Sequence, residues 1–222
     1  MTVKMRFPQG LYGITPEWDD TDKLIAAVEL AAAHGMRSLQ LRRKNISPAA
    51  RKEQAERLQV VCRRLGVVFI INDDWQLARD IGADGVHIGR EDADLAAVRA
   101  ALGPDVIVGT SCYNDFSLAQ TALAHGADYV AYGAMYPSPT KPNAARASMD
   151  LLARTRALLE TYESPRPALV AIGGITPANA EAVAIAGADA LAVITGLFEA
   201  DDIAAAARTV AHAVAHANSN TI

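Results

Sequence analysis

Two aspartates could hold a metal ion through oxygen atoms alone. Asp73 follows the apolar run that ends at Asn72, and Asp92 follows the run that ends at Ile88. Carboxylate ligands suit Mg²⁺, which keeps part of its water shell and completes its coordination with substrate phosphate. Asp92 also precedes a predicted helix, where it could serve as the N-cap, a role compatible with metal ligation. We therefore expect a Mg²⁺ site at these two carboxylates.

Three cations could bind a strongly charged anion near this site. Arg42 and Lys44 follow another apolar run, and Lys141 lies in a proline-rich segment. Arginine offers a planar fork of donors and lysine a point charge, a combination that suits a pyrophosphate. Arg43 alternates to the opposite side of the strand end, so we expect it on the surface.

Glycine pairs predict a second phosphate site. Gly173-Gly174 precedes Thr176-Pro177, a capping hydroxyl with proline at the first helical position, and Thr195-Gly196 follows another apolar run. Glycine lets backbone N–H groups approach a phosphate closely, and a helix N-terminus adds its dipole. Tight turns without any ligand are the alternative explanation of these glycines.

Groups for nucleophilic attack or proton transfer are weaker candidates. His87 lies inside an apolar run and is interpreted as a packed core histidine rather than a proton carrier. Cys112 follows Ser111 with no activating base nearby in the sequence, so we do not expect a thiol nucleophile. The sequence shows no Ser-His-Asp grouping, zinc-ligand spacing or Walker loop.

The composition limits the classes of partner. The 222 residues include 21 Lys and Arg against 25 Asp and Glu, a formal net charge of -4. This weak acidity argues against nucleic acid as the main partner. We expect neither a signal peptide nor a membrane span, which needs about 18 apolar residues. Cys62 and Cys112 lie in unlike contexts, so we expect reduced thiols in a cytoplasmic protein, with a homo-oligomer left open.

Short apolar runs alternate with alanine-rich helical patterns along the whole chain. Continuous apolar runs are typical of strands buried on both faces of a parallel sheet. The predicted strands are Leu11–Thr15, Ser38–Arg42, Val67–Asn72, Gly85–Ile88, Val106–Thr110, Tyr129–Gly133, Ala168–Ile172 and Ala190–Thr195. The predicted helices are Thr21–His34, Pro48–Leu65, Trp75–Ile81, Asp92–Leu102, Phe116–His125, Ser148–Tyr162, Pro177–Ala186 and Asp201–His216. This alternation predicts one (β/α)8 TIM-barrel domain over residues 1–222.

A repeated pattern favours the barrel. A glycine, a short polar step and an apolar run recur at Gly35, Gly82, Gly126 and Gly187, before every second predicted strand. Glycine there can end a helix in the left-handed conformation, and alternate strands of a barrel share layers of inward side chains. A doubly wound open sheet is the alternative, but Tyr12–Pro16 lacks the glycine-rich dinucleotide turn expected after its first strand.

The barrel interpretation brings the candidate residues to one place. Active sites of such barrels lie at the C-terminal ends of the strands, and the cations, carboxylates and glycines above all follow strand candidates. Polar loops without function would explain Glu91, Asn114 and Asp115. They explain poorly the grouping of two phosphate sites and one metal site around a single mouth.

The ordered set of motifs resembles thiamine-phosphate synthase from about Leu11 to Ala200, nearly the whole chain. The motifs are Gln40-Leu41-Arg42-x-Lys44, Asn72-Asp73, His87-Ile88-Gly89-x-x-Asp92, Gly109-x-Ser111, Thr140-Lys141 and Ile172-Gly173-Gly174-Ile175. The resemblance implies a Mg²⁺-dependent barrel enzyme that joins 4-amino-5-hydroxymethyl-2-methylpyrimidine diphosphate to 4-methyl-5-(2-hydroxyethyl)thiazole phosphate. Its products would be thiamine phosphate and pyrophosphate.

The resemblance also implies a role for each matching residue. The pyrimidine diphosphate would be bound by Gln40, Arg42, Lys44, Asn72, Ser111 and Lys141, of which Arg42, Lys44, Ser111 and Lys141 form the expected catalytic group. Asp73 and Asp92 would hold Mg²⁺. The thiazole phosphate site would be lined by Ser138 and Thr140 and completed by Gly173, Gly174, Ile194 and Thr195.

The chain departs from the pattern of thiamine-phosphate synthase at a few positions. Asp74 stands where the family commonly has Arg, and Arg90 where it has Gln, so we expect these two opposite charges to compensate each other. Ser138-Pro139-Thr140 replaces Thr-x-Thr and Thr195-Gly196 replaces Ser-Ala, but both keep a hydroxyl. The alternatives are a thiazole tautomerase-like paralogue, which would not need the diphosphate and metal residues, and a non-catalytic phosphate-binding barrel.

Overall fold

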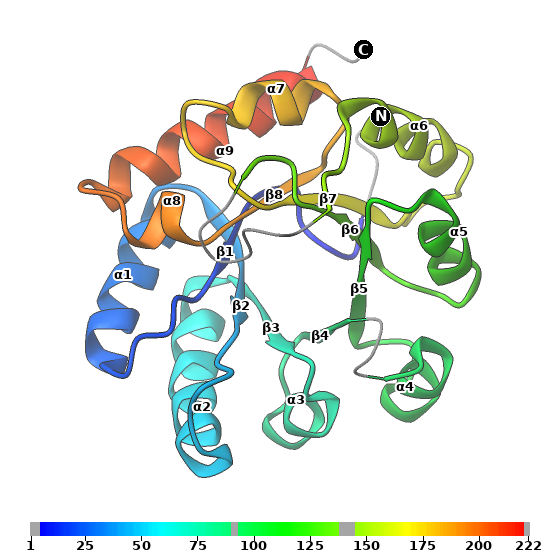
Figure 1. The fold of residues 1–222 in the computed structure, drawn as a ribbon. Helices are drawn as coiled ribbons and strands as arrows, with labels where there is room; N and C mark the ends of the chain where they lie inside the picture. Colours follow the sequence, from blue (N-terminus) through cyan, green and yellow to red (C-terminus); the bar gives the residue numbers. More distant parts are fainter. Residues whose placement is uncertain (1–4, 90–92, 138–144, 220–222) are drawn as a thin grey trace.

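The computed structural model describes residues 5–89, 93–137 and 145–219. In these residues eight parallel strands pair in chain order and close into a barrel, and helices lie around it (Figure 1). The strands are β1 (Gly10–Ile14), β2 (Met36–Leu41), β3 (Val68–Asn72), β4 (Gly85–Ile88), β5 (Ile107–Tyr113), β6 (Tyr129–Tyr132), β7 (Ala168–Ile172) and β8 (Ala190–Val193). The predicted (β/α)8 barrel is confirmed.

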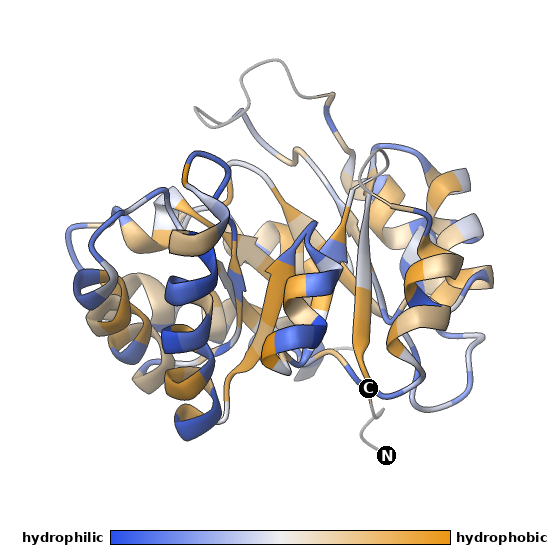
Figure 2. Ribbon diagram, turned by 90° about the horizontal axis from the view of Figure 1, so that it is seen from below, coloured by the Kyte–Doolittle hydropathy of each residue, from blue (hydrophilic) through white to orange (hydrophobic). Residues whose placement is uncertain are grey.

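The helices follow the strands in alternation. Their bounds are α1 (Thr21–Ala33), α2 (Pro48–Leu65), α3 (Trp75–Ile81), α4 (Leu95–Leu102), α5 (Phe116–Ala124), α6 (Met149–Leu159), α7 (Ala180–Ile185), α8 (Thr195–Phe198) and α9 (Ile203–Ser219). Figure 2 shows hydrophobic strands in the centre and helices whose hydrophilic residues lie mostly on the outside. The apolar faces of the helices pack on the outer face of the barrel, as is usual for amphipathic helices.

Two helix starts lie three residues later than predicted. α4 begins at Leu95 with Asp94 as its N-cap, whose Oδ1 accepts the amide of Ala97 at 2.9 Å. Asp92 is therefore not the cap of this helix, and the capping explanation for it is wrong. α7 begins at Ala180 rather than Pro177, because the Asn179 side chain ties the preceding segment into a turn before the helix starts.

A third difference lies after the last strand. The residues Thr195–Phe198, predicted as strand end and loop, form the short helix α8, which begins directly after Ile194. β8 has only four residues and ends at Val193, so the helix begins earlier than the apolar run up to Thr195 suggests. This places Thr195 and Gly196 in the first turn of a helix, where backbone N–H groups have no intrahelical partner.

The repeat found in the sequence holds the strands together at the bottom of the barrel. Asp84, Asp128 and Asp189 precede β4, β6 and β8, and each carboxylate accepts the amide of a residue on the strand before it, at 2.7 to 2.8 Å. The backbone carbonyls of Asp84, Asp128 and Asp189 accept the amides that begin β5, β7 and β1, respectively. Each aspartate thus joins three consecutive strands at three of the four repeats; the repeat before β2 has no aspartate.

The interior of the barrel is filled by side chains that alternate with those of the outer core. This inner cluster includes Tyr12, Ile70, Ile107, Tyr129 and Val170. Residues 5–9 close the bottom, where the buried Phe7 ring lies 4.9 Å from the Tyr12 ring and 4.3 Å from the Tyr129 ring, centroid to centroid. In the described ranges no helix is long and apolar enough to cross a membrane.

Candidate active site

Four predicted or candidate residues point into the barrel from neighbouring strands. Gln40 lies on β2, Asn72 on β3, His87 on β4 and Ser111 on β5. Asn72 pairs with His87 in the register of β3 and β4, and these strands follow one another around the barrel. Gln40 and His87 are buried, whereas Asn72 and Ser111 are partly exposed. The structure therefore brings these side chains to one side of the barrel mouth.

The predicted cation Lys44 contacts the predicted metal ligand Asp73, and the predicted cation Arg42 lies near Glu17. Lys44 Nζ lies 3.2 Å from Asp73 Oδ2. The carboxylate of Glu17, in the loop after β1, accepts the Lys44 amide at 3.0 Å and lies 3.8 Å from a guanidinium nitrogen of Arg42. The mouth thus holds two ion pairs, Arg42 with Glu17 and Lys44 with Asp73, whose cations and carboxylates suit a diphosphate and a divalent cation respectively.

Arg43 is buried, and its prediction as a surface residue is wrong. Its side chain is only 3% exposed and donates to Trp18 O and Asp19, with Glu17 Oε2 3.4 Å from its Nε. The strand ends at Leu41, so strand alternation no longer decides where residue 43 points. Arg43 instead fastens the β1–α1 loop to the end of β2, next to the two cations of the mouth.

Asp73 has a backbone conformation that few side chains adopt. Its φ is 64°, in the left-handed region, and its amide donates to His87 O at 2.8 Å. Asp and Asn tolerate this region better than most residues. The next residue, Asp74, points elsewhere: it caps α3 through the amide of Leu77 and lies 3.5 Å from an Arg51 nitrogen. Asp74 therefore has a partner of opposite charge in Arg51.

The glycine pair and α8 lie on the opposite side of the mouth, at the ends of β7 and β8. Gly173 and Gly174 have φ values of 96° and 64°, which favour glycine. A Cβ on Gly174 would lie 2.5 Å from Pro137 O, so this residue also lets the β6–α6 connection approach closely. Ile194 and Thr195 stand at the start of α8 beside them. Packing alone accounts for these glycines, and phosphate binding there stays a prediction.

Several predicted residues lie outside the described residues. These are the metal candidate Asp92, the β6–α6 residues Ser138, Thr140 and Lys141, and Arg90, the expected partner of Asp74. The ends of the β6–α6 connection are described: the Ala134 amide donates to Ala145 O at 2.9 Å, the Ala147 amide donates to Ala134 O at 3.0 Å, and Arg146 donates to Met135 O at 2.6 Å.

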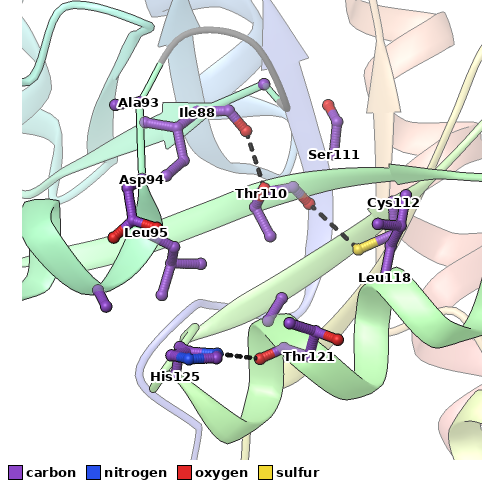
Figure 3. A pocket seen from close by; sticks show the side chains of 13 residues that line it. Ile88, Ala93, Asp94, Leu95, Thr110, Ser111, Cys112, Leu118, Thr121 and His125 are labelled. Atoms are coloured by element: carbon purple, nitrogen blue, oxygen red, sulfur yellow. Dashed lines mark hydrogen bonds between the residues drawn. The ribbon is translucent and has the colours of Figure 1, made fainter.

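A cavity of about 470 Å³ lies outside the barrel, between the ends of β4 and β5 and the helices α4 and α5 (Figure 3). Its lining includes Ile88, Leu95, Ser111, Cys112 and His125. Burial raises the pKa of the Cys112 thiol to about 12, so the thiol stays protonated, in agreement with the expectation that it is not a nucleophile. Ser111 lines both this cavity and the barrel mouth, whereas Gln40, Asn72 and Asp73 do not line the cavity.

Comparison with known proteins identifies the family. The model of the family "Thiamine monophosphate synthase" matches residues 11–197. The chain belongs to the thiamine monophosphate synthase family. Thiamine-phosphate synthase of Bordetella avium is 61% identical over 207 residues, which are 93% of this chain and 95% of the relative. The one of Chromobacterium violaceum is 51% identical and covers 91% of this chain and 95% of its own.

A solved structure supports the same assignment. Thiamine phosphate pyrophosphorylase from Pyrococcus furiosus superposes with a TM-score of 0.81 at 28% identity, over 96% of this chain and 98% of that one. Membership of the thiamine monophosphate synthase family makes the protein a transferase of thiamine biosynthesis. The family resemblance stated from the motifs alone is thereby confirmed.

Among the described residues, one of the two predicted Mg²⁺ ligands, Asp73, is in a position that suits this ion. The Asp73 carboxylate is partly exposed at the mouth and supplies the oxygen donors that Mg²⁺ prefers. Within the described ranges no group of three or more His, Cys, Asp or Glu side chains is arranged to hold a metal ion. Mg²⁺ is commonly held by one or two carboxylates together with substrate phosphates, so the residues present fit this ion.

One residue of the mouth and two residues beneath it were missed in the sequence. Glu17 follows the first strand candidate as the carboxylates follow later ones, so the rule that strand ends carry function would have found it. Tyr12 and Tyr129 gave no such signal, because continuous apolar runs do not reveal which residues face the interior of a barrel. Both lie inside it and connect candidate site residues by hydrogen bonds.

Proposed function

We propose that the protein is a Mg²⁺-dependent thiamine-phosphate synthase that joins 4-amino-5-hydroxymethyl-2-methylpyrimidine diphosphate to 4-methyl-5-(2-hydroxyethyl)thiazole phosphate. The observation that carries the proposal is the contact of Lys44 with Asp73 beside Arg42, at the ends of adjacent strands. Cations and a carboxylate oxygen in one place suit a diphosphate that is bound together with a divalent cation. The curated relatives named thiamine-phosphate synthase cover nearly the whole chain and support it further.

The proposed reaction requires little acid–base catalysis from the protein. The lone pair of the thiazole nitrogen forms the new C–N bond, and the C–O bond to the diphosphate breaks with its electron pair leaving on pyrophosphate. In a dissociative course, a pyrimidinylmethyl cation stabilised by its amino group precedes the C–N bond. Because the nucleophile is neutral, no general base is needed.

The side chains of the mouth would act on charge and position. Arg42 and Lys44, with Lys141, would stabilise the leaving pyrophosphate, and Asp73, with Asp92, would hold Mg²⁺. Bound there, Mg²⁺ would neutralise charge that develops on the leaving group. Gln40, Asn72 and Ser111 would orient the pyrimidine, while Gly173, Gly174, Ile194, Thr195, Ser138 and Thr140 would bind the thiazole phosphate. Alignment and exclusion of water would supply the rest of the rate increase.

A product assay tests the proposal. The purified protein is incubated with both substrates and Mg²⁺, and thiamine phosphate and pyrophosphate are measured. We expect both products in equal amounts, and none when either substrate or the metal is left out. Rearrangement of a thiazole substrate without use of the diphosphate would instead indicate the tautomerase-like activity. Binding of the phosphates without turnover would indicate a phosphate-binding barrel, and either result would overturn the proposal.

A further inference from the structure

A chain of hydrogen bonds crosses the barrel interior beneath the mouth. Gln40 Nε2 donates to the Tyr12 hydroxyl at 2.7 Å, and this hydroxyl lies 3.1 Å from that of Tyr129. The Tyr129 hydroxyl lies 2.9 Å from His87 Nδ1, and His87 Nε2 lies 2.9 Å from Ser111 Oγ. Both ends of the chain, Gln40 and Ser111, are residues to which the proposed function assigns the pyrimidine. The three residues between them have no role in it.

The middle of this chain is held rigidly. Tyr12 is 1% exposed and Tyr129 is fully buried. The imidazole of His87 stacks on the Tyr129 ring, with 5.6 Å between centroids and 20° between planes. Gly109 makes room for the same ring, because a Cβ there would lie 1.9 Å from it. Close packing of this kind leaves the two hydroxyls few other positions.

Burial also fixes which atoms of the chain carry protons. It raises the pKa of both phenols, Tyr12 and Tyr129, well above the ordinary value, so both remain protonated. Each hydroxyl therefore has one hydrogen to donate and lone pairs with which to accept. A chain of such groups has only two consistent directions.

The orientation of the Gln40 amide decides between these directions. Among the described residues, the Tyr12 hydroxyl has two partners, Gln40 and Tyr129. Because Gln40 Nε2 donates to this hydroxyl, the Tyr12 hydrogen must be donated to the Tyr129 hydroxyl. Tyr129 then donates to His87 Nδ1, and His87 Nε2–H donates to Ser111 Oγ. A buried hydroxyl hydrogen without an acceptor would be costly, so every step follows from the first.

We propose that Tyr12, Tyr129 and His87 are positioning residues that set Ser111 as a hydrogen-bond donor and the Gln40 carbonyl as an acceptor at the mouth. Such a pair recognises a ring that carries an amino group beside a ring nitrogen, since the amino group donates and the nitrogen accepts. It disfavours the corresponding ring with a carbonyl in place of the amino group. The inference rests on the proposed function, whose pyrimidine has this pattern.

Nuclear magnetic resonance tests the direction of the chain without reference to activity. Protein with ¹⁵N-labelled histidine reports the tautomer of His87, whose signals are assigned by their absence in His87→Asn. We expect the Nε2–H tautomer in the wild type and its loss or mixing in Tyr129→Phe. The matched control is Tyr132→Phe, which removes another buried hydroxyl of the same strand. The Tyr132 hydroxyl accepts a hydrogen bond from Thr155 at 3.0 Å and does not belong to the series from Gln40 to Ser111. An Nδ1–H tautomer or an imidazolium in the wild type would overturn the proposal.

Steady-state kinetics tests the consequence for the substrate. In Tyr129→Phe we expect KM for the pyrimidine diphosphate to rise about tenfold or more, with KM for the thiazole phosphate within about twofold of wild type. Tyr132→Phe should keep both values within about twofold. Tyr12→Phe replaces Tyr129→Phe if the latter does not fold. An unchanged KM for the pyrimidine diphosphate would refute the positioning role. A wild type that makes no thiamine phosphate would refute the proposed function, while the tautomer would still decide the direction of the chain.

Discussion

The negative charge of Asp73 is the single-residue feature on which the proposed metal site depends. Asparagine tolerates the left-handed backbone at position 73, so Asp73→Asn removes the charge and leaves the shape nearly intact. We expect turnover to fall by about 100-fold or more, because a few kcal/mol of transition-state stabilisation is lost, with little change in the melting temperature. The measurement is kcat against Mg²⁺ concentration, where part of the loss should be recovered at high Mg²⁺.

The neighbouring Asp74 provides the control for this variant. Asp74→Asn keeps a side chain that can cap α3 and removes only the contact with Arg51, at 3.5 Å. Its turnover should remain within about twofold of wild type. If the two variants had superimposable Mg²⁺ curves, Asp73 would not be a metal ligand.

The two cysteine thiols should be inert in the folded protein. Burial raises the pKa of Cys62 and that of Cys112 to about 12 each, from an ordinary value of 9.0. The raised pKa means that burial of the neutral thiols contributes stability fully below pH 9 and loses it as the pH rises toward 12. At pH 8 we therefore expect no alkylation by iodoacetamide in buffer and two modifications in urea, read by mass spectrometry. Rapid labelling of either thiol in the native state would contradict this.

Among the elements, the β1–α1 loop depends on the end of β2. Arg43 donates to Trp18 O and pairs with Asp19 and Glu17 from a buried position, so its replacement leaves these groups without their partner. Arg43→Met should lower the free energy of unfolding by about 2 kcal/mol, less than for a fully buried pair because Asp19 is exposed. Urea denaturation measures the loss.

The matched change for this element is Arg57→Met, on the exposed face of α2. Arg57 pairs with Asp22, and both side chains face solvent. Exposed pairs contribute about 0 to 1 kcal/mol, so this variant should unfold at nearly the urea concentration of wild type. Equal losses for Arg43→Met and Arg57→Met would mean that the loop is not held by Arg43. Arg43→Met should also raise KM for the pyrimidine diphosphate, because Glu17 contacts Arg42 and Lys44 from the same loop.

For the whole molecule, the three equivalent aspartates should differ in importance with their burial. Asp189 is fully buried and paired with Arg166 at 2.7 Å and Arg156 at 2.6 Å, whereas Asp128 is slightly exposed and Asp84 is exposed. Replacement of each by Asn should cost about 3 kcal/mol or more at Asp189, less at Asp128 and about 1 kcal/mol at Asp84. Urea denaturation of the three variants gives the order. KM values should stay unchanged, because these residues lie at the end of the barrel opposite the mouth. A reversed order would contradict the prediction that the contribution of each aspartate to the free energy of unfolding increases with its burial.

Local residue patterns were enough to predict the architecture of this protein. Alternation of apolar runs with helical patterns predicted all eight strands within a few residues of their observed bounds, because strands buried on both faces must be apolar throughout. The recurring glycine and short polar step before every second strand indicated a closed barrel. The motifs around Arg42, Asp73 and Gly174 indicated the family, since local residue types at strand ends are visible without any three-dimensional information.

The directions of side chains and their contacts could not be read from these patterns, because they depend on how distant segments pack together. Arg43 is buried because the strand ends at Leu41 and a distant loop covers it, and no local pattern reports where a strand stops. The contact of Lys44 with Asp73 and the chain from Gln40 to Ser111 join residues of different strands. Their partners are chosen by the register and closure of the barrel. Long-range contacts of this kind depend on packing in three dimensions, and a continuous apolar run carries no record of them.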